Sequence, residues 1–188
     1  MKKIFSCIIL VATLVAPGFS QKADGPKEFT VDGIKVIFKP SIKEISSVRL
    51  FIKGGTANFT KDEEGIEALA LAVATQGGTK SMTKTEFATA LEKIGTTIGT
   101  SSALDYSEVN LSCLNTYWND SWKLFADAIA NPRFDSKEFD LIKGQLVAGA
   151  KESEANPDAH LVAKSLQNTF AGKNYSKKAT GTAASLEK

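Results

Sequence analysis

The sequence is poor in the side chains that bind metals or act as nucleophiles. Its 188 residues include a single histidine, His160, and only two cysteines, Cys7 and Cys113. A catalytic zinc ion needs three side-chain ligands and an open position for water. So few histidines and cysteines exclude an ordinary zinc site. His160 lies on a predicted helix, and we expect it to be a surface or capping residue.

The chain also lacks an excess of charge of either sign. Lys and Arg number 23 against 21 Asp and Glu, with both signs interspersed, and the formal net charge is +2. This balance argues against electrostatic capture of nucleic acid or of anionic membranes. Hydrophobic residues make up 43% of the chain, which is enough for one domain with a substantial core.

The apolar run at the amino terminus is too short to span a membrane. It extends from Ile4 to Val15 after two lysines, and small residues precede Gln21. We expect residues 1–20 to be a secretory signal peptide; a buried strand or an anchor helix is the alternative. The protein would then be exported, to the periplasm if the source is Gram-negative and otherwise secreted, with no membrane association after cleavage. Cys113 would be the one cysteine left, predicted to be a buried strand residue.

The hydrophobic pattern predicts an α+β fold with a two-layer, mixed but mostly antiparallel sheet packed by helices. Asp32-Gly33 predicts a hairpin turn. Strands are expected at 48–53, 96–102 and 106–114. Helices are expected at about 62–75, after the Thr83 capping box, before Pro132, after Asp135 and after Asn156. The apolar faces of these helices are predicted to pack in the hydrophobic core. They include the largely aromatic face formed by Trp118, Trp122, Phe125 and Ile129.

Several short motifs are spread along the chain. They are Asp32-Gly33, Lys53-Gly54-Gly55, Gly65-Ile66-Glu67, Gly77-Gly78-Thr79, Asn131-Pro132-Arg133-Phe134, Asn156-Pro157 and Gly181-Thr182. Together they resemble the amino-terminal domain of the pitrilysin/insulinase family of zinc peptidases, the inverzincins. The resemblance covers about residues 28–188. It implies the metallopeptidase-like fold of that family, with residues 21–188 as an inverzincin-like amino-terminal domain. Family members continue into a further helix and strand and a second homologous domain. We therefore expect an incomplete chain, with a natural short protein as the alternative.

The resemblance also implies a degenerate catalytic centre. In active members, the helix that begins at the position of Gly65 carries His-x-x-Glu-His, two zinc ligands around a general base. The matching positions here are Ala68, Leu71 and Ala72, and the third ligand, a glutamate, falls at Gly149. We predict no metal, no cofactor, no catalytic residue and no enzymatic activity. Ala68, Ala72 and Gly149 are expected to converge around an apolar or empty spot.

One binding feature can survive the loss of the zinc ligands. In active relatives, the strand that follows the second helix receives the substrate as an added strand. Its matching residues are Gly99, Thr100, Ser101 and Ser102. Main-chain pairing of this kind does not depend on side-chain chemistry. The alternative is a strand covered by the remainder of a longer protein.

Three functions are compatible with these observations. The first is a non-catalytic family member that forms a substrate chamber, as a heterodimer, with an active zinc peptidase paralogue. The second is a free-standing exported module that binds extended peptides. The third, an active zinc metallopeptidase with misplaced ligands, needs histidines that the sequence does not contain. An adjacent gene for a homologue with an intact motif would favour the first.

Overall fold

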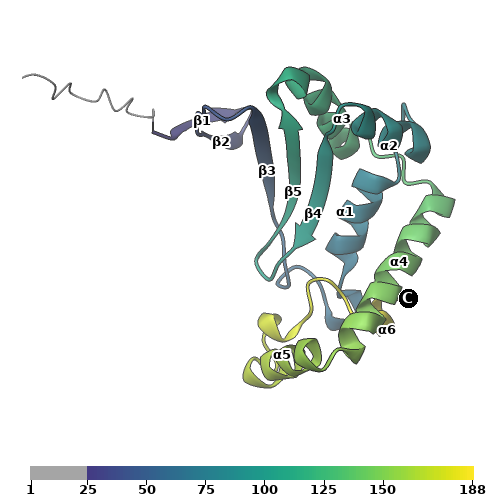
Figure 1. Ribbon diagram of the computed structural model, residues 1–188. Coiled ribbons are helices and arrows are strands. Elements are labelled where there is room, and N and C mark those ends of the chain that lie inside the picture. The colour runs from purple at the N-terminus through teal and green to yellow at the C-terminus, as the bar shows by residue number, and fades with distance from the viewer. Residues whose placement is uncertain (1–24) are drawn as a thin grey trace, which may run out of the picture. The chain divides into compact units, whose positions relative to one another are not determined.

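The computed structural model describes residues 25–188, which fall into two compact units (Figure 1). The first unit ends at Lys43 and the second spans Glu44–Lys188. The expected signal peptide, residues 1–20, lies outside the described residues. Within those residues, no helix is both long enough and apolar enough to cross a membrane.

The first unit contains the predicted hairpin. Strands β1 (Lys27–Val31) and β2 (Ile34–Phe38) pair antiparallel, and Val31 lies opposite Ile34 across the turn. Asp32 and Gly33 have φ angles of 48° and 82°. A type I′ turn needs positive φ at both central residues, which explains the Asp-Gly pair. The hairpin prediction is confirmed.

The second unit is built on a three-stranded antiparallel sheet. Strands β3 (Ile45–Lys53), β5 (Tyr106–Leu114) and β4 (Thr97–Ser102) lie in the order β3-β5-β4. Val109, Leu111 and Cys113 of the central strand are buried, as their alternation predicted. The expected parallel component does not occur within residues 25–188, because the pairs β1–β2, β3–β5 and β4–β5 are all antiparallel.

Helices cover one face of this sheet in two layers. Helix α1 lies beside β4, and α4 lies on the far side of α1 from the sheet (Figure 1). The predicted caps Thr83, Asp135 and Asn156 precede α2, α4 and α5. The α+β class and the order of elements are confirmed. The helices are α1 (Ile66–Gln76), α2 (Lys84–Lys93), α3 (Trp118–Ala130), α4 (Ser136–Ala155), α5 (Pro157–Thr169) and the short α6 (Ala183–Leu186).

The predicted start of the first helix was wrong. The capping box at Thr60 does form, with the Glu63 carboxylate accepting from the Thr60 N–H at 2.8 Å. It caps only a single 3-10 turn, Lys61–Glu63. The chain then passes through Gly65 at φ 88°, a left-handed conformation that interrupts a helix. Helix α1 therefore begins at Ile66.

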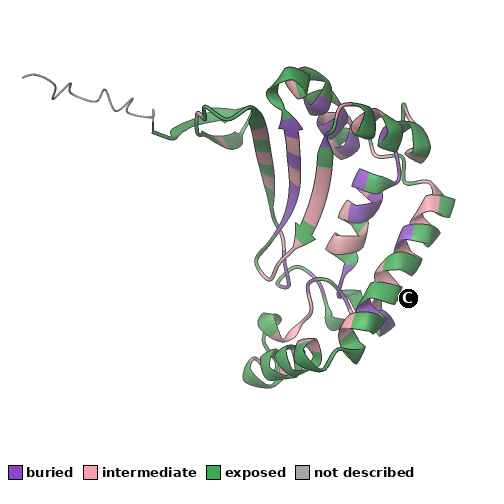
Figure 2. Ribbon diagram, viewed as in Figure 1, coloured by how far each residue is buried: buried purple, intermediate pink, exposed green. Residues whose placement is uncertain are grey.

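The predicted burial of the apolar helix stripes was right only in part. In α3, Phe125 is 3% exposed, whereas Trp122 stacks between Trp118 and Phe125 and stays 44% exposed. In α5, Leu161 is 69% exposed. Figure 2 shows α5 almost entirely as exposed surface. Helical periodicity identifies an apolar face, but it does not determine whether another element covers that face.

Candidate functional site

Ala72, one of the α1 positions predicted to match the zinc motif, is packed against other apolar side chains. Ala72 is 4% exposed and clusters with Val73 and with Ile142 of α4. Leu69, Phe139 and Leu146 pack around this cluster. Ala68 is half-buried on the same helix. Side chains of α4 thus fill the space beside the Ala72 position.

Gly149, the predicted position of the third ligand, is exposed on α4, and a Cβ built there meets nothing within 4 Å. Across residues 25–188, no three His, Cys, Asp or Glu side chains gather closely enough to hold a metal ion. The aliphatic and glycine residues at these positions offer no donor atom, so they do not fit a zinc ion. Convergence of Ala68, Ala72 and Gly149 on one spot stays a prediction.

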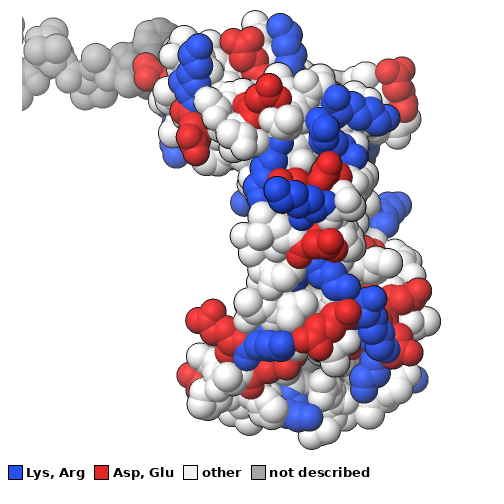
Figure 3. Space-filling view, turned by 90° about the vertical axis from the view of Figure 1, so that its right-hand side faces the viewer, with Lys and Arg blue, Asp and Glu red and all other residues white. Residues whose placement is uncertain are grey.

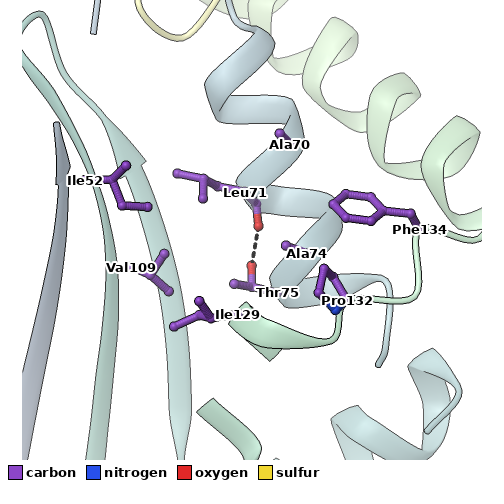
Figure 4. A pocket seen from close by; sticks show the side chains of 9 residues that line it. All are labelled: Ile52, Ala70, Leu71, Ala74, Thr75, Val109, Ile129, Pro132 and Phe134. Carbon is purple, nitrogen blue, oxygen red and sulfur yellow. Dashed lines mark hydrogen bonds between the residues drawn. The ribbon is translucent and has the colours of Figure 1, made fainter. Parts of the chain in front are cut away.

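Leu71, the predicted position of the general base, borders an apolar cavity of about 300 Å³ between α1 and the sheet (Figure 4). Thr75 contributes the one side-chain hydroxyl, which donates to the Leu71 carbonyl at 2.9 Å. No charged side chain lines the cavity, so it contains no group that could transfer a proton at neutral pH. The lining residues are Ile52, Ala70, Leu71, Ala74, Thr75, Val109, Ile129, Pro132 and Phe134.

Glu67, the residue before Ala68 in α1, connects the helix to the sheet through hydrogen bonds. Its carboxylate accepts the Gly55 N–H at 2.9 and 3.0 Å and the Ser107 hydroxyl at 2.7 Å. The Ser107 hydroxyl also lies 3.0 Å from the Ser102 hydroxyl of β4. A Cβ at Gly54 would lie 2.5–2.9 Å from the Glu67 carboxyl group, so glycine makes room for it. We name this arrangement the Glu67 clamp. Its glycines and its glutamate belong to separate sequence motifs, and neither motif indicates that they are in contact.

Two other motif glycines meet at the start of α1. A Cβ on Gly65 would lie 2.7 Å from the Cα of Gly181, so both residues must stay small. Beside them, Glu64 is 3% exposed. Burial raises the pKa of the Glu64 carboxyl above its ordinary value, while the Lys178 N–H and nearby lysine charges partly oppose the shift.

Charged side chains on the α4 side of the second unit do not form a single patch (Figure 3). On the side where α4 lies, lysines and carboxylates are interspersed (Figure 3). His160 is exposed on α5. These surfaces agree with the balanced composition and offer no concentrated field for a charged ligand.

The predicted peptide-binding residues Gly99, Thr100, Ser101 and Ser102 all lie in β4, at one edge of the sheet. Beyond the end of β4, the Ala103 N–H donates to the Tyr106 carbonyl at 2.8 Å. Hydrogen-bonded and non-hydrogen-bonded pairs alternate along an antiparallel ladder. With the observed register, Gly99 and Ser101 direct their main-chain groups toward β5. Ile98, Thr100 and Ser102 direct theirs away from the sheet.

The two edges of the sheet differ in chemistry. On β3, the residues with outward main-chain groups include Arg49 and Lys53, and charged side chains of this kind hinder pairing with a further strand. Strand β4 consists of Thr97-Ile98-Gly99-Thr100-Ser101-Ser102, with no charge and no proline. By composition, β4 is therefore the edge of the described sheet that suits an added strand.

The second unit is an α+β domain, and within residues 25–188 no three His, Cys, Asp or Glu side chains lie close enough to hold a metal ion. The model of the insulinase family, Peptidase family M16, matches residues 35–183. The chain belongs to this family. No curated protein matches it in sequence.

Three solved structures share the fold. An inactive M16 peptidase domain from Pseudomonas fluorescens is 21% identical with a TM-score of 0.76, and 86% of this chain aligns with 40% of that one. A protease from Helicobacter pylori is 16% identical with a TM-score of 0.77, at the same coverage of both chains. A chain of complex III2 from Candida albicans, with Inz-5 bound, is 22% identical with a TM-score of 0.70, and 87% of this chain aligns with 37% of that one. The protein thus spans about two fifths of the length of these structures.

Proposed function

We propose that this protein is a non-catalytic insulinase-family homologue that forms a substrate chamber with an active zinc peptidase paralogue. One observation supports the proposal: the residues that the family resemblance aligns with the ligand and base positions are Ala68, Leu71, Ala72 and Gly149, while the chain matches the family over residues 35–183. A similar structure is described as an inactive domain, which supports the same interpretation. The proposal includes export, because residues 1–20 have the pattern of a signal peptide.

The retained β4 edge gives the domain a role that needs no metal. An extended peptide, such as a substrate of the paralogue, would pair with the outward main-chain groups of Ile98, Thr100 and Ser102. Pairing along a strand holds a peptide straight and in register, and this prepares it for cleavage by the metal-bearing subunit. The inactive domain thus contributes substrate contacts and the active one contributes the chemistry.

The decisive experiment combines this chain with an insulinase-family homologue from the same genome that carries an intact His-x-x-Glu-His motif. Thr100→Pro removes an outward N–H, and proline is tolerated at sheet edges, so the fold should persist. Thr100→Val is the matched control, since it keeps both the N–H and the β-branched shape. We expect co-purification, and a fall in peptide hydrolysis of about tenfold with the proline variant alone.

A second proline variant tests the geometry of the edge. Ser101→Pro would remove a main-chain donor directed at β5, so it should destabilise the sheet itself. Peptide hydrolysis by the homologue that is unchanged when this chain is omitted would refute the subunit role. It would favour instead a free-standing peptide-binding module.

A further inference from the structure

A side-chain amide lies over the middle of the β4 edge strand. Asn110 of β5 is paired with Gly99, and its side chain lies on the sheet face opposite to buried Val109 and Leu111. A Cβ built on Gly99 would lie 2.9 Å from the Asn110 Oδ1 and 3.1 Å from its Nδ2. Glycine at position 99 is therefore what allows the amide to lie across β4.

The side-chain amide of Asn110 is available for a new hydrogen bond. Within residues 25–188, neither of its polar atoms has a hydrogen-bond partner, although the residue is half-buried. The next polar side chain on this face, Glu108, is already paired with Arg49 at 3.4 Å. Asn110 thus presents a free donor and a free acceptor beside the open edge.

A strand added to β4 would bring its side chains close to this amide. Neighbouring strands lie about 4.8 Å apart, and directly opposed side chains on one face have Cβ atoms roughly 5 Å apart. The residue opposite Gly99 would therefore come close to the amide, whose Oδ1 lies 2.9 Å from where a Cβ on Gly99 would be. A polar side chain could satisfy the amide, whereas an apolar one would bury it without a partner.

We propose that Asn110 is a specificity-determining residue that selects a polar, uncharged side chain opposite Gly99. This inference rests on the proposed peptide pairing at β4. A neutral amide supplies both a donor and an acceptor but no charge to balance an ion. On the helix side, Ile98 packs in the apolar clusters around Phe87 and Val109. The preferred peptide therefore alternates polar with apolar residues.

The test uses two fluorescein-labelled peptides and the full chain. One peptide is Lys-Val-Thr-Val-Thr-Val-Lys, and in the other both threonines are replaced by valine, which has the same shape without the hydroxyl. Fluorescence anisotropy should show that the protein binds the threonine peptide about five- to tenfold more tightly. Asn110→Leu should reduce this ratio to about one. Gly99→Ala should also lower the ratio, because the added methyl displaces the amide.

Controls separate this inference from the proposal on which it rests. Ser112→Ala changes the next residue on the same face of β5, opposite Thr97, and should leave the ratio unchanged. If neither peptide binds, or if Thr100→Pro binds both as well as the unaltered protein does, the edge is not a peptide site and the proposed function fails. If Thr100→Pro abolishes binding but Asn110→Leu keeps the full preference, only the role of Asn110 is overturned.

Discussion

The Glu67 clamp allows a sharp test of how α1 is held on the sheet. Replacing Glu67 with alanine leaves the Gly55 N–H and the Ser107 hydroxyl without their shared acceptor. Hydrogen bonds to a charged group contribute about 1.5–3 kcal/mol each in partly buried positions. Because the site is half-buried, water will replace part of this contribution. We expect the free energy of unfolding to fall by about 2–3 kcal/mol.

This change is large enough to measure by urea unfolding and by calorimetry. For a chain of this size it corresponds to a fall of roughly 5–10 °C in the melting temperature. Glu67→Gln keeps one acceptor oxygen and should cost about 1 kcal/mol. The control is Glu92→Ala, which removes an exposed glutamate from α2 and should change stability by less than about 0.5 kcal/mol.

Gly54→Ala provides a second test of the Glu67 clamp. Its new methyl would overlap the Glu67 carboxylate, so the substitution should destabilise the unaltered protein but have little effect in the Glu67→Ala background. The reasoning is refuted if Glu67→Ala is no more harmful than the control. It is also refuted if the two substitutions are simply additive.

Two further predictions follow from the altered site and the buried carboxyl group. In calorimetric titration at micromolar concentration, the protein should show no stoichiometric zinc binding. Restoring the His-x-x-Glu-His motif and the third ligand should create such binding. A restored variant that folds but does not bind zinc would contradict the alignment. Glu64 has a raised pKa in the folded state, so its favourable contribution is complete below the ordinary value of 4.5 and is lost as pH rises through the raised value. The free energy of unfolding of Glu64→Gln should therefore rise relative to that of the unaltered protein as pH increases from 4 to 8. If urea unfolding gives the same pH dependence for both proteins, this prediction is wrong. The restored variant carries Ala68→His, Leu71→Glu, Ala72→His and Gly149→Glu.

Local patterns predicted the elements well. The turn at Asp32-Gly33 and the caps at Thr83, Asp135 and Asn156 depend on atoms within a few residues, so the sequence contains all that is needed to recognise them. The start of α1 was misplaced for the opposite reason. Its boundary depends on Gly65, whose left-handed turn packs against Gly181, more than a hundred residues later.

The sequence by itself determined that the chain contains a single histidine, too few for a His-x-x-Glu-His motif, and it predicted the buried residues Val109, Leu111 and Cys113 of β5. Both follow from residue identity and spacing alone. Only the tertiary structure decided that Glu67 bonds to Gly55 and Ser107, that Thr100 rather than Ser101 directs its N–H outward, and that Asn110 lies over Gly99. These facts depend on strand register and on how α1 packs against the sheet. Register and packing result from contacts between residues far apart in the chain, which no local pattern specifies.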